Sequence, residues 1–142
     1  MSHFDQVVAE VLAQPFHRAC ELALLEAGDG RSEIGFAVNE FTRNPAGVLH
    51  GGILYALLDV GCFLAVMTRL NDDQHAVTVE THTSVLRAAQ AGEQVVIRAA
   101  ADRLGRTLAA MRAEAFAVTP AGEERLIATG SVTKAVLQGR QH

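Results

Sequence analysis

The segment from Gly51 to about Leu70 is apolar on every side, and this feature constrains the fold more than any other. A helix at a protein surface keeps one polar face, so a helix without such a face is expected to be surrounded by protein. The apolar run from Ile53 to Met67 contains Asp59 and is shorter than the roughly 20 residues of a membrane span, which also tolerates a central carboxylate badly. We therefore expect a buried helix in a soluble, cytoplasmic protein.

Shorter patterned runs flank this segment. Helical spacing extends from Phe4 to Leu12 and stops before Pro15, and two strand-like runs, 19–26 and 32–39, surround a Gly-Asp-Gly turn. Four further strand-like runs follow the apolar segment, at about 75–88, 93–104, 107–119 and 124–137. The gaps between them are short, so neighbouring strands are expected to pair antiparallel. The pattern predicts one α+β domain, 1–142, with an antiparallel sheet curled around the buried helix.

The first of these four strands shows an alternation that predicts the faces of the sheet. One face carries Thr78, Glu80 and His82, and the other carries Val77, Val79 and Thr81. Seven positions separate His75 from His82, so we expect their side chains on opposite faces. No cluster of His, Cys and carboxylate residues has the spacing of a metal site. Cys20 and Cys62 have apolar neighbours and are expected to be buried, reduced thiols.

Composition argues against two classes of protein and favours self-association. A net charge of −4 argues against a nucleic-acid-binding protein, which needs a basic face for phosphates. A hydrophobic content of 49% argues against disorder. A sheet that carries one helix leaves further surface uncovered, and its strands hold few charges. We therefore expect a second copy of the chain to cover it, giving at least a dimer.

Asp59 is the residue that most needs an explanation. It lies two turns into the apolar helix, where an ionised carboxylate is costly unless it has partners or water. Gly51 and Gly52 open the same helix, and the backbone N–H groups there favour an anion or a developing oxyanion. His50 precedes them and Asn44 lies six residues upstream, and both can donate a hydrogen bond to a carbonyl oxygen. These are the parts that hydrolysis of an activated acyl group requires.

Each of these residues also has a structural interpretation. His50 can cap the helix, Asn44 can stabilise the Asn-Pro turn, and the paired glycines can allow close packing of helix on sheet. Asp59 can form one half of an ion pair, for example with an arginine from a strand. Nothing else in the sequence calls for a carboxylate at position 59.

The order Asn44, His50-Gly51-Gly52 and Asp59 on an apolar helix resembles the hotdog-fold acyl-CoA thioesterases, in particular the phenylacetate-degradation (PaaI-like) group. The resemblance extends over nearly the whole chain. It implies a curved antiparallel sheet wrapped around one long helix, and two subunits joined edge to edge with the active site across their interface. The homo-oligomer is then a dimer or a dimer of dimers (a homotetramer). Ala88 stands where many relatives carry proline, which affects the local loop and not the chemistry.

The resemblance also implies a role for individual residues. Asp59 is the nucleophile or general base, and the Gly51 N–H of the other subunit polarises the thioester carbonyl. Asn44 and His50 position that carbonyl and the attacking water, and Thr78 orients the water. The coenzyme A tail meets the turn formed by Arg103, Gly105, Arg106 and Thr107, where arginine suits its phosphates. No metal or redox cofactor is implied, because coenzyme A enters only as part of the substrate.

We therefore expect an enzyme that hydrolyses an aryl-acyl or short- to medium-chain acyl-CoA to the free acid and CoA. A non-catalytic acyl-CoA-binding protein of the same fold needs the pocket but not Asp59. A 3-hydroxyacyl-thioester dehydratase or hydratase typically pairs the Asp with a His a few residues later, and the next histidine here is His75. A structural dimer without a ligand leaves Asp59 unexplained.

Overall fold

The computed structural model describes residues 1–139, and the last three residues of the predicted 1–142 domain lie outside it. Its elements follow one another as α1 (His3–Ala13), α2 (Pro15–Ala19), β1 (Ala23–Gly28), β2 (Arg31–Ala37), α3 (Gly51–Met67), β3 (Gln74–Val85), β4 (Gln94–Leu104), β5 (Leu108–Val118) and β6 (Glu124–Gln138). β1 begins four residues after the start predicted for the first strand, because the short helix α2, which opens at Pro15, occupies the chain up to Ala19. Proline is favourable in the first turn of a helix, because a backbone N–H at that position would have no intrahelical acceptor.

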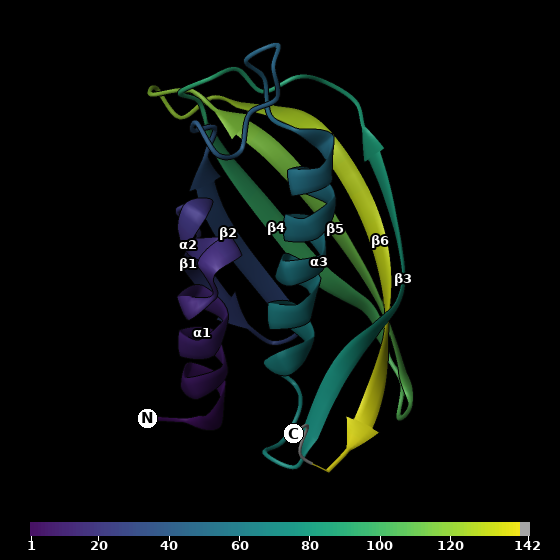
Figure 1. The fold of residues 1–142 in the computed structure, drawn as a ribbon. Coiled ribbons are helices and arrows are strands. Elements are labelled where there is room, and N and C mark those ends of the chain that lie inside the picture. The colour runs from purple at the N-terminus through teal and green to yellow at the C-terminus, as the bar shows by residue number, and fades with distance from the viewer. Residues whose placement is uncertain (140–142) are drawn as a thin grey trace.

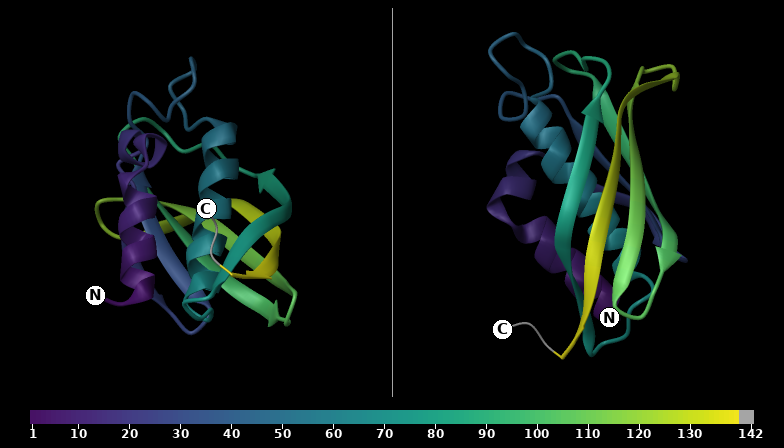
Figure 2. Two further views of the ribbon diagram at one scale, coloured as in Figure 1. Left: turned by 60° about the horizontal axis from the view of Figure 1, so that its bottom comes forward. Right: turned by 90° about the vertical axis from the view of Figure 1, so that its right-hand side faces the viewer.

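The strands form one antiparallel sheet in the order β1-β2-β4-β5-β6-β3, curved around α3 (Figures 1 and 2). The predicted α+β architecture is therefore confirmed. The expectation that chain neighbours pair is right for β4 with β5 and for β5 with β6, but wrong for β3 with β4. β3 pairs with β6 at the far edge of the sheet, and β4 pairs with β2. The connection between β3 and β4 crosses the end of the sheet beside the loop before α3, where the Leu49 N–H donates to the Ala89 carbonyl.

α3 packs against the concave face of the sheet, but this chain does not surround it as its apolar sequence predicts: Tyr55 is 50% exposed, and Ala56, Asp59 and Val60 are only partly buried. Alanines on β5 let the helix approach closely; four of them face the core, Ala109, Ala113, Ala115 and Ala117, together with the larger Met111. A Cβ on Gly61 would lie 3.2 Å from Ile97 Cγ2, tighter than an ordinary contact. Each fully buried leucine of α3, such as Leu57 or Leu64, stabilises the fold by roughly 1.5–3 kcal/mol through removal of its side chain from water.

The N-terminal helix α1 lies beside α3 and covers part of the core (Figure 1). Ser2 and Asp5 form a capping box at its start, and the predicted apolar face of Phe4, Val7, Val8 and Val11 packs against the core. Among residues 1–139, no helix is long and apolar enough to cross a membrane.

A bulge in β3 changes which of its side chains share a face. The register of β3 against β6 shifts between Thr78 and Glu80, so Thr78 lies opposite Lys134 and Thr81 lies opposite Val132. Lys134 and Val132 are both buried, which puts Thr78 and Thr81 on the same inner face. The predicted alternation is therefore wrong beyond Val79, because the extra residue reverses the phase of the strand.

The same bulge corrects the prediction for the two histidines of β3. His75 pairs with Leu137 and His82 with Ser131, two positions that share the outer face of β6. The two side chains therefore lie on one face and not on opposite faces.

Candidate active site

The N-terminus of α3 is capped by the histidine that precedes it. His50 Nδ1 accepts a hydrogen bond from the Gly52 N–H at 2.9 Å, and the His50 carbonyl accepts from the N–H groups of Ile53 and Leu54. The Gly51 N–H has no acceptor among residues 1–139. Gly51 therefore presents a free backbone donor in the first turn of the helix, where the dipole adds positive potential.

The cap also determines where the His50 proton sits. A neutral imidazole that accepts at Nδ1 carries its proton on Nε2, so the exposed His50 ring offers an Nε2–H donor. A Cβ on Gly52 would lie 3.0 Å from His50 Cε1 and Nδ1, which explains a glycine at this position. A Cβ on Gly51 would meet nothing closer than Val85 Cγ2, at 3.9 Å. A small side chain at position 51 would therefore meet no clash within this chain.

Asn44 builds the loop that leads to His50. Its Oδ1 accepts hydrogen bonds from the N–H groups of Ala46 (3.0 Å) and Val48 (3.3 Å). The structural interpretation of Asn44 is therefore correct for its carbonyl oxygen. No hydrogen bond within residues 1–139 uses the Asn44 Nδ2 group.

Asp59 forms a compact polar cluster with two strand residues. Lys134 Nζ donates to Asp59 Oδ1 at 2.7 Å and to Thr78 Oγ1 at 2.7 Å. Thr78 Oγ1 in turn donates to both Asp59 oxygens, at 3.0 Å and 3.1 Å. The Asp59 side chain is 30% exposed, so it reaches solvent on the same side of α3 as Tyr55, which is 50% exposed one turn earlier. The ion-pair interpretation of Asp59 is thus right in kind, although the partner is a lysine and not an arginine.

Lys134 is the site residue that sequence reasoning missed. It is the single lysine in a chain with eleven arginines, and it is 2% exposed. The signal was present, because Lys134 lies between Val132 and Val136 at a spacing of two and so shares their inward face. Its ammonium also lies 5.5 Å from the centroid of the Phe63 ring, a cation–π distance.

Cys62, three residues after Asp59, takes no visible part in this cluster. Burial raises the pKa of its thiol to about 12, and neither Cys62 nor Cys20 forms a disulfide. A thiol with such a pKa is almost wholly protonated near neutral pH. The predicted role of Cys62 as a core residue is confirmed.

One chain does not bring all the predicted residues together. Gly51 and Asp59 are eight residues apart on α3, a separation of about 12 Å along the helix axis at 1.5 Å per residue. The free amide and the carboxylate of one chain therefore cannot meet at the same carbonyl group.

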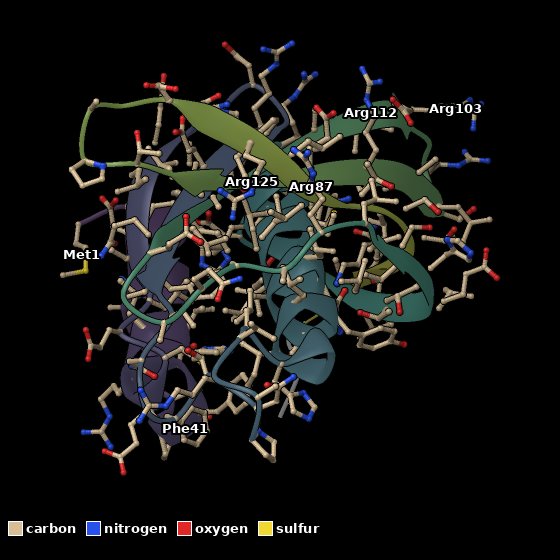
Figure 3. The ribbon with its side chains drawn as sticks, turned by 90° about the horizontal axis from the view of Figure 1, so that it is seen from above. Met1, Phe41, Arg87, Arg103, Arg112 and Arg125 are labelled. Atoms are coloured by element: carbon tan, nitrogen blue, oxygen red, sulfur yellow. The ribbon has the colours of Figure 1, made fainter. Side chains whose placement is uncertain are left out.

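The predicted coenzyme A turn joins β4 to β5. The Gly105 N–H donates to the Leu108 carbonyl, and a Cβ on Gly105 would lie 2.8 Å from that oxygen, so the turn requires glycine. The Thr107 carbonyl accepts from the Val136 N–H, two residues beyond Lys134. Arg103 extends from the outer margin of the sheet, away from α3 (Figure 3), so this chain does not bring Arg103 to Asp59.

A cavity of about 840 Å³ lies between α1 and the C-terminal half of α3. Phe63 and Met67, one and two turns after Asp59, line it from α3 and Val7 and Val11 line it from α1, but most of the lining is polar and includes residues at the start of β3. Asp59 is not part of this lining. The cavity therefore begins one helical turn beyond the polar cluster.

A long helix wrapped by a curved six-stranded antiparallel sheet defines the hotdog fold. The family model described as "Thioesterase superfamily" matches residues 46–124. The chain is 30% identical to acyl-coenzyme A thioesterase 13 of Homo sapiens, over 94% of this chain and 97% of that protein. A thioesterase family protein from Silicibacter pomeroyi superposes with a TM-score of 0.87 at 30% identity, over 96% of this chain and 99% of that chain.

A mutant of the phenylacetic acid degradation protein PaaI from Thermus thermophilus is also similar. It superposes with a TM-score of 0.75 at 30% identity, over 86% of this chain and 98% of that chain. The chain therefore belongs to the thioesterase superfamily, as its sequence motifs predicted. Membership in this superfamily makes it a thioester hydrolase.

Proposed function

We propose that this protein hydrolyses an acyl-CoA with an aryl-acyl or short- to medium-chain acyl group, releasing the free acid and CoA. The observation that carries the proposal is the Asp59 carboxylate, held by Lys134 and Thr78 on an apolar helix yet still open to solvent. The substrate class is supported by the similarity to acyl-coenzyme A thioesterase 13, and the aryl-acyl option by the similarity to PaaI.

Asp59 acts in one of two ways. As a nucleophile, one carboxylate oxygen attacks the thioester carbon, CoA leaves as the thiolate, and water hydrolyses the resulting anhydride. As a general base, Asp59 takes a proton from water while that water attacks the same carbon. Both routes place negative charge on the carbonyl oxygen, so both need a hydrogen-bond donor there, a contribution of roughly 3–4 kcal/mol.

The Gly51 N–H of a second copy supplies that donor. The donor and the attacking group must both lie about 3 Å from atoms of one carbonyl group, and about 12 Å separates them along α3 in a single chain. A homo-oligomer, either a dimer or a dimer of dimers, meets this requirement. The edge position of β3 and the exposed side chains of Val79 and Val85 on it support pairing of two copies along this strand.

The remaining residues position the substrate. His50 through Nε2–H and Asn44 through Nδ2 hold the carbonyl and the attacking water, and Thr78 orients that water. Because the Thr78 proton points to Asp59, its oxygen meets the water as an acceptor. Arg103, Arg106 and Thr107, in the turn shaped by Gly105, bind the phosphates of the CoA tail.

The test is release of free thiol from a panel of acyl-CoA esters by the wild type and by Asp59→Asn. We expect a loss of roughly 10²- to 10⁴-fold in kcat for the variant, with circular dichroism and light-scattering mass unchanged. An undiminished kcat would reject Asp59 as the reacting carboxylate. Binding of acyl-CoA by the wild type without thiol release would instead indicate a binding protein.

Single-turnover hydrolysis in heavy-oxygen water tests for direct attack. Label recovered in the Asp59 carboxylate indicates direct attack, because water then opens an anhydride. Label found only in the product acid shows that water added to the acyl carbon, as it does in the general-base route and in an anhydride opened at that carbon.

A further inference from the structure

The Lys134 ammonium is buried inside the protein, unlike the ammonium group of a surface lysine. It is 2% exposed, and its polar partners among residues 1–139 are Asp59 Oδ1 and Thr78 Oγ1. Burying an ammonium group carries a large desolvation cost, and a buried pair is often no more stable than apolar residues of similar volume. Stability alone is therefore a weak reason for a lysine between two inward-facing valines.

The chemistry of lysine fits the task better than that of arginine, although arginine is used elsewhere in the chain. An arginine fork binds both oxygens of a carboxylate, as Arg98 does with Glu124. A lysine is a point charge and binds one oxygen. Here the ammonium is bonded to Oδ1 of Asp59. Oδ2 accepts a hydrogen bond from the Thr78 hydroxyl, and the same hydroxyl also donates to Oδ1.

Lys134 also fixes the direction of the Thr78 hydroxyl. An ammonium group donates and never accepts, so Thr78 Oγ1 must accept from it and direct its own proton to Asp59. The register of β3 on β6, with Thr78 opposite Lys134 just before the bulge, holds the two side chains together.

We propose that Lys134 is a positioning residue of the hydrolytic site: it holds Asp59 through Oδ1, so that Oδ2 is the oxygen presented to the thioester or to the attacking water. The inference rests on the proposed function. It concerns the orientation of the reacting group, so its effect belongs in kcat and not in substrate affinity.

The first experiment is a double-mutant cycle of Lys134→Met, Asp59→Asn and the pair together, assayed by thiol release. Methionine keeps the unbranched shape and removes the charge. We expect Lys134→Met to lower kcat by about 10- to 100-fold with KM within about twofold, and to have no further effect in the Asp59→Asn background. Arg98→Met, which breaks an ion pair on the outer face of the sheet, is the matched control and keeps wild-type kcat.

A kcat for Lys134→Met equal to that of Arg98→Met overturns the inference, as does an equal loss in both backgrounds of the cycle. Neither result touches the proposed function, because the wild type still hydrolyses acyl-CoA. Absence of thiol release by the wild type would instead reject the proposed function.

A second measurement avoids the risk that Lys134→Met fails to fold. Because Lys134 is the only lysine, ¹⁵N-lysine labelling gives a single side-chain ammonium signal in the NMR spectrum of the wild-type protein. We expect that signal to shift when a non-hydrolysable acyl-CoA thioether binds, and to stay in place with CoA alone. A signal unmoved by the thioether at saturating concentration overturns the inference.

Discussion

His50 Nδ1 accepts from the Gly52 N–H at 2.9 Å, and the same ring would lie 3.0 Å from a Cβ at position 52. The hydrogen bond and the missing side chain are therefore two parts of one arrangement. Together they fix the His50 ring over the first turn of α3 and direct its Nε2–H outward. The neighbouring Gly51 is under no such constraint from its own chain.

This difference predicts opposite outcomes for two similar substitutions. Gly51→Ala gains up to about 0.5–1 kcal/mol from the lower backbone entropy of alanine in the unfolded chain. Gly52→Ala has the same entropic gain, but it displaces the His50 ring. The loss of that helix cap costs about 1 kcal/mol and offsets the gain. We expect Gly52→Ala to be less stable than Gly51→Ala by about 1 kcal/mol in urea unfolding. Equal stabilities would show that the cap is not strained by the added methyl group.

Arg106 lies in the β4–β5 turn, where we propose that the CoA tail binds. A guanidinium that contacts phosphate contributes only when the substrate carries the nucleotide. We expect Arg106→Ala to raise KM for CoA esters roughly tenfold, about 1.4 kcal/mol, and to leave KM for thioesters without the nucleotide nearly unchanged. An equal rise for both substrate types would argue against contact with the tail.

The ion pair of Glu93 with Arg125 predicts a pH dependence of stability. Hydrogen bonds from Arg125 hold the pKa of the Glu93 carboxyl below its ordinary value of 4.5. A carboxyl whose pKa is lower in the folded state stabilises the fold above its unfolded value and loses that contribution as pH falls through the folded value. We expect Tm to fall as pH drops below about 4.5, and the fall to be smaller in Arg125→Gln. Parallel curves for the two proteins would show that the pair contributes nothing measurable.

The two cysteines are expected to resist thiol reagents in the folded state. Burial raises the pKa of Cys62 to about 12 and that of Cys20 to about 11, so neither thiolate is populated at about pH 8. An aromatic disulfide reagent should label both thiols in denaturant and neither in the native protein. Rapid native-state labelling of Cys62 would show that α3 opens locally.

Local patterns in the sequence were enough to predict the main elements. The apolar run after Gly51 predicted the central helix, and the turn residues predicted most strand boundaries, because a helix repeat, a cap or a tight turn depends on residues close in the chain. The same locality marked Asp59 as an anomaly, since one carboxylate among apolar neighbours is visible without a structure. Those patterns were also sufficient to indicate the superfamily.

Local sequence patterns did not predict which residues far apart in the chain come into contact. Asp59 and Lys134 are 75 residues apart and meet at 2.7 Å, and their contact depends on β6 lying between β5 and β3. The bulge at Val79 sets which residue of β3 faces Lys134, and a shift of one residue in a strand moves every later side chain to the other face. Strand order and register result from the packing of the whole sheet around α3. The identity of the cation beside Asp59 therefore emerged only once the chain was folded.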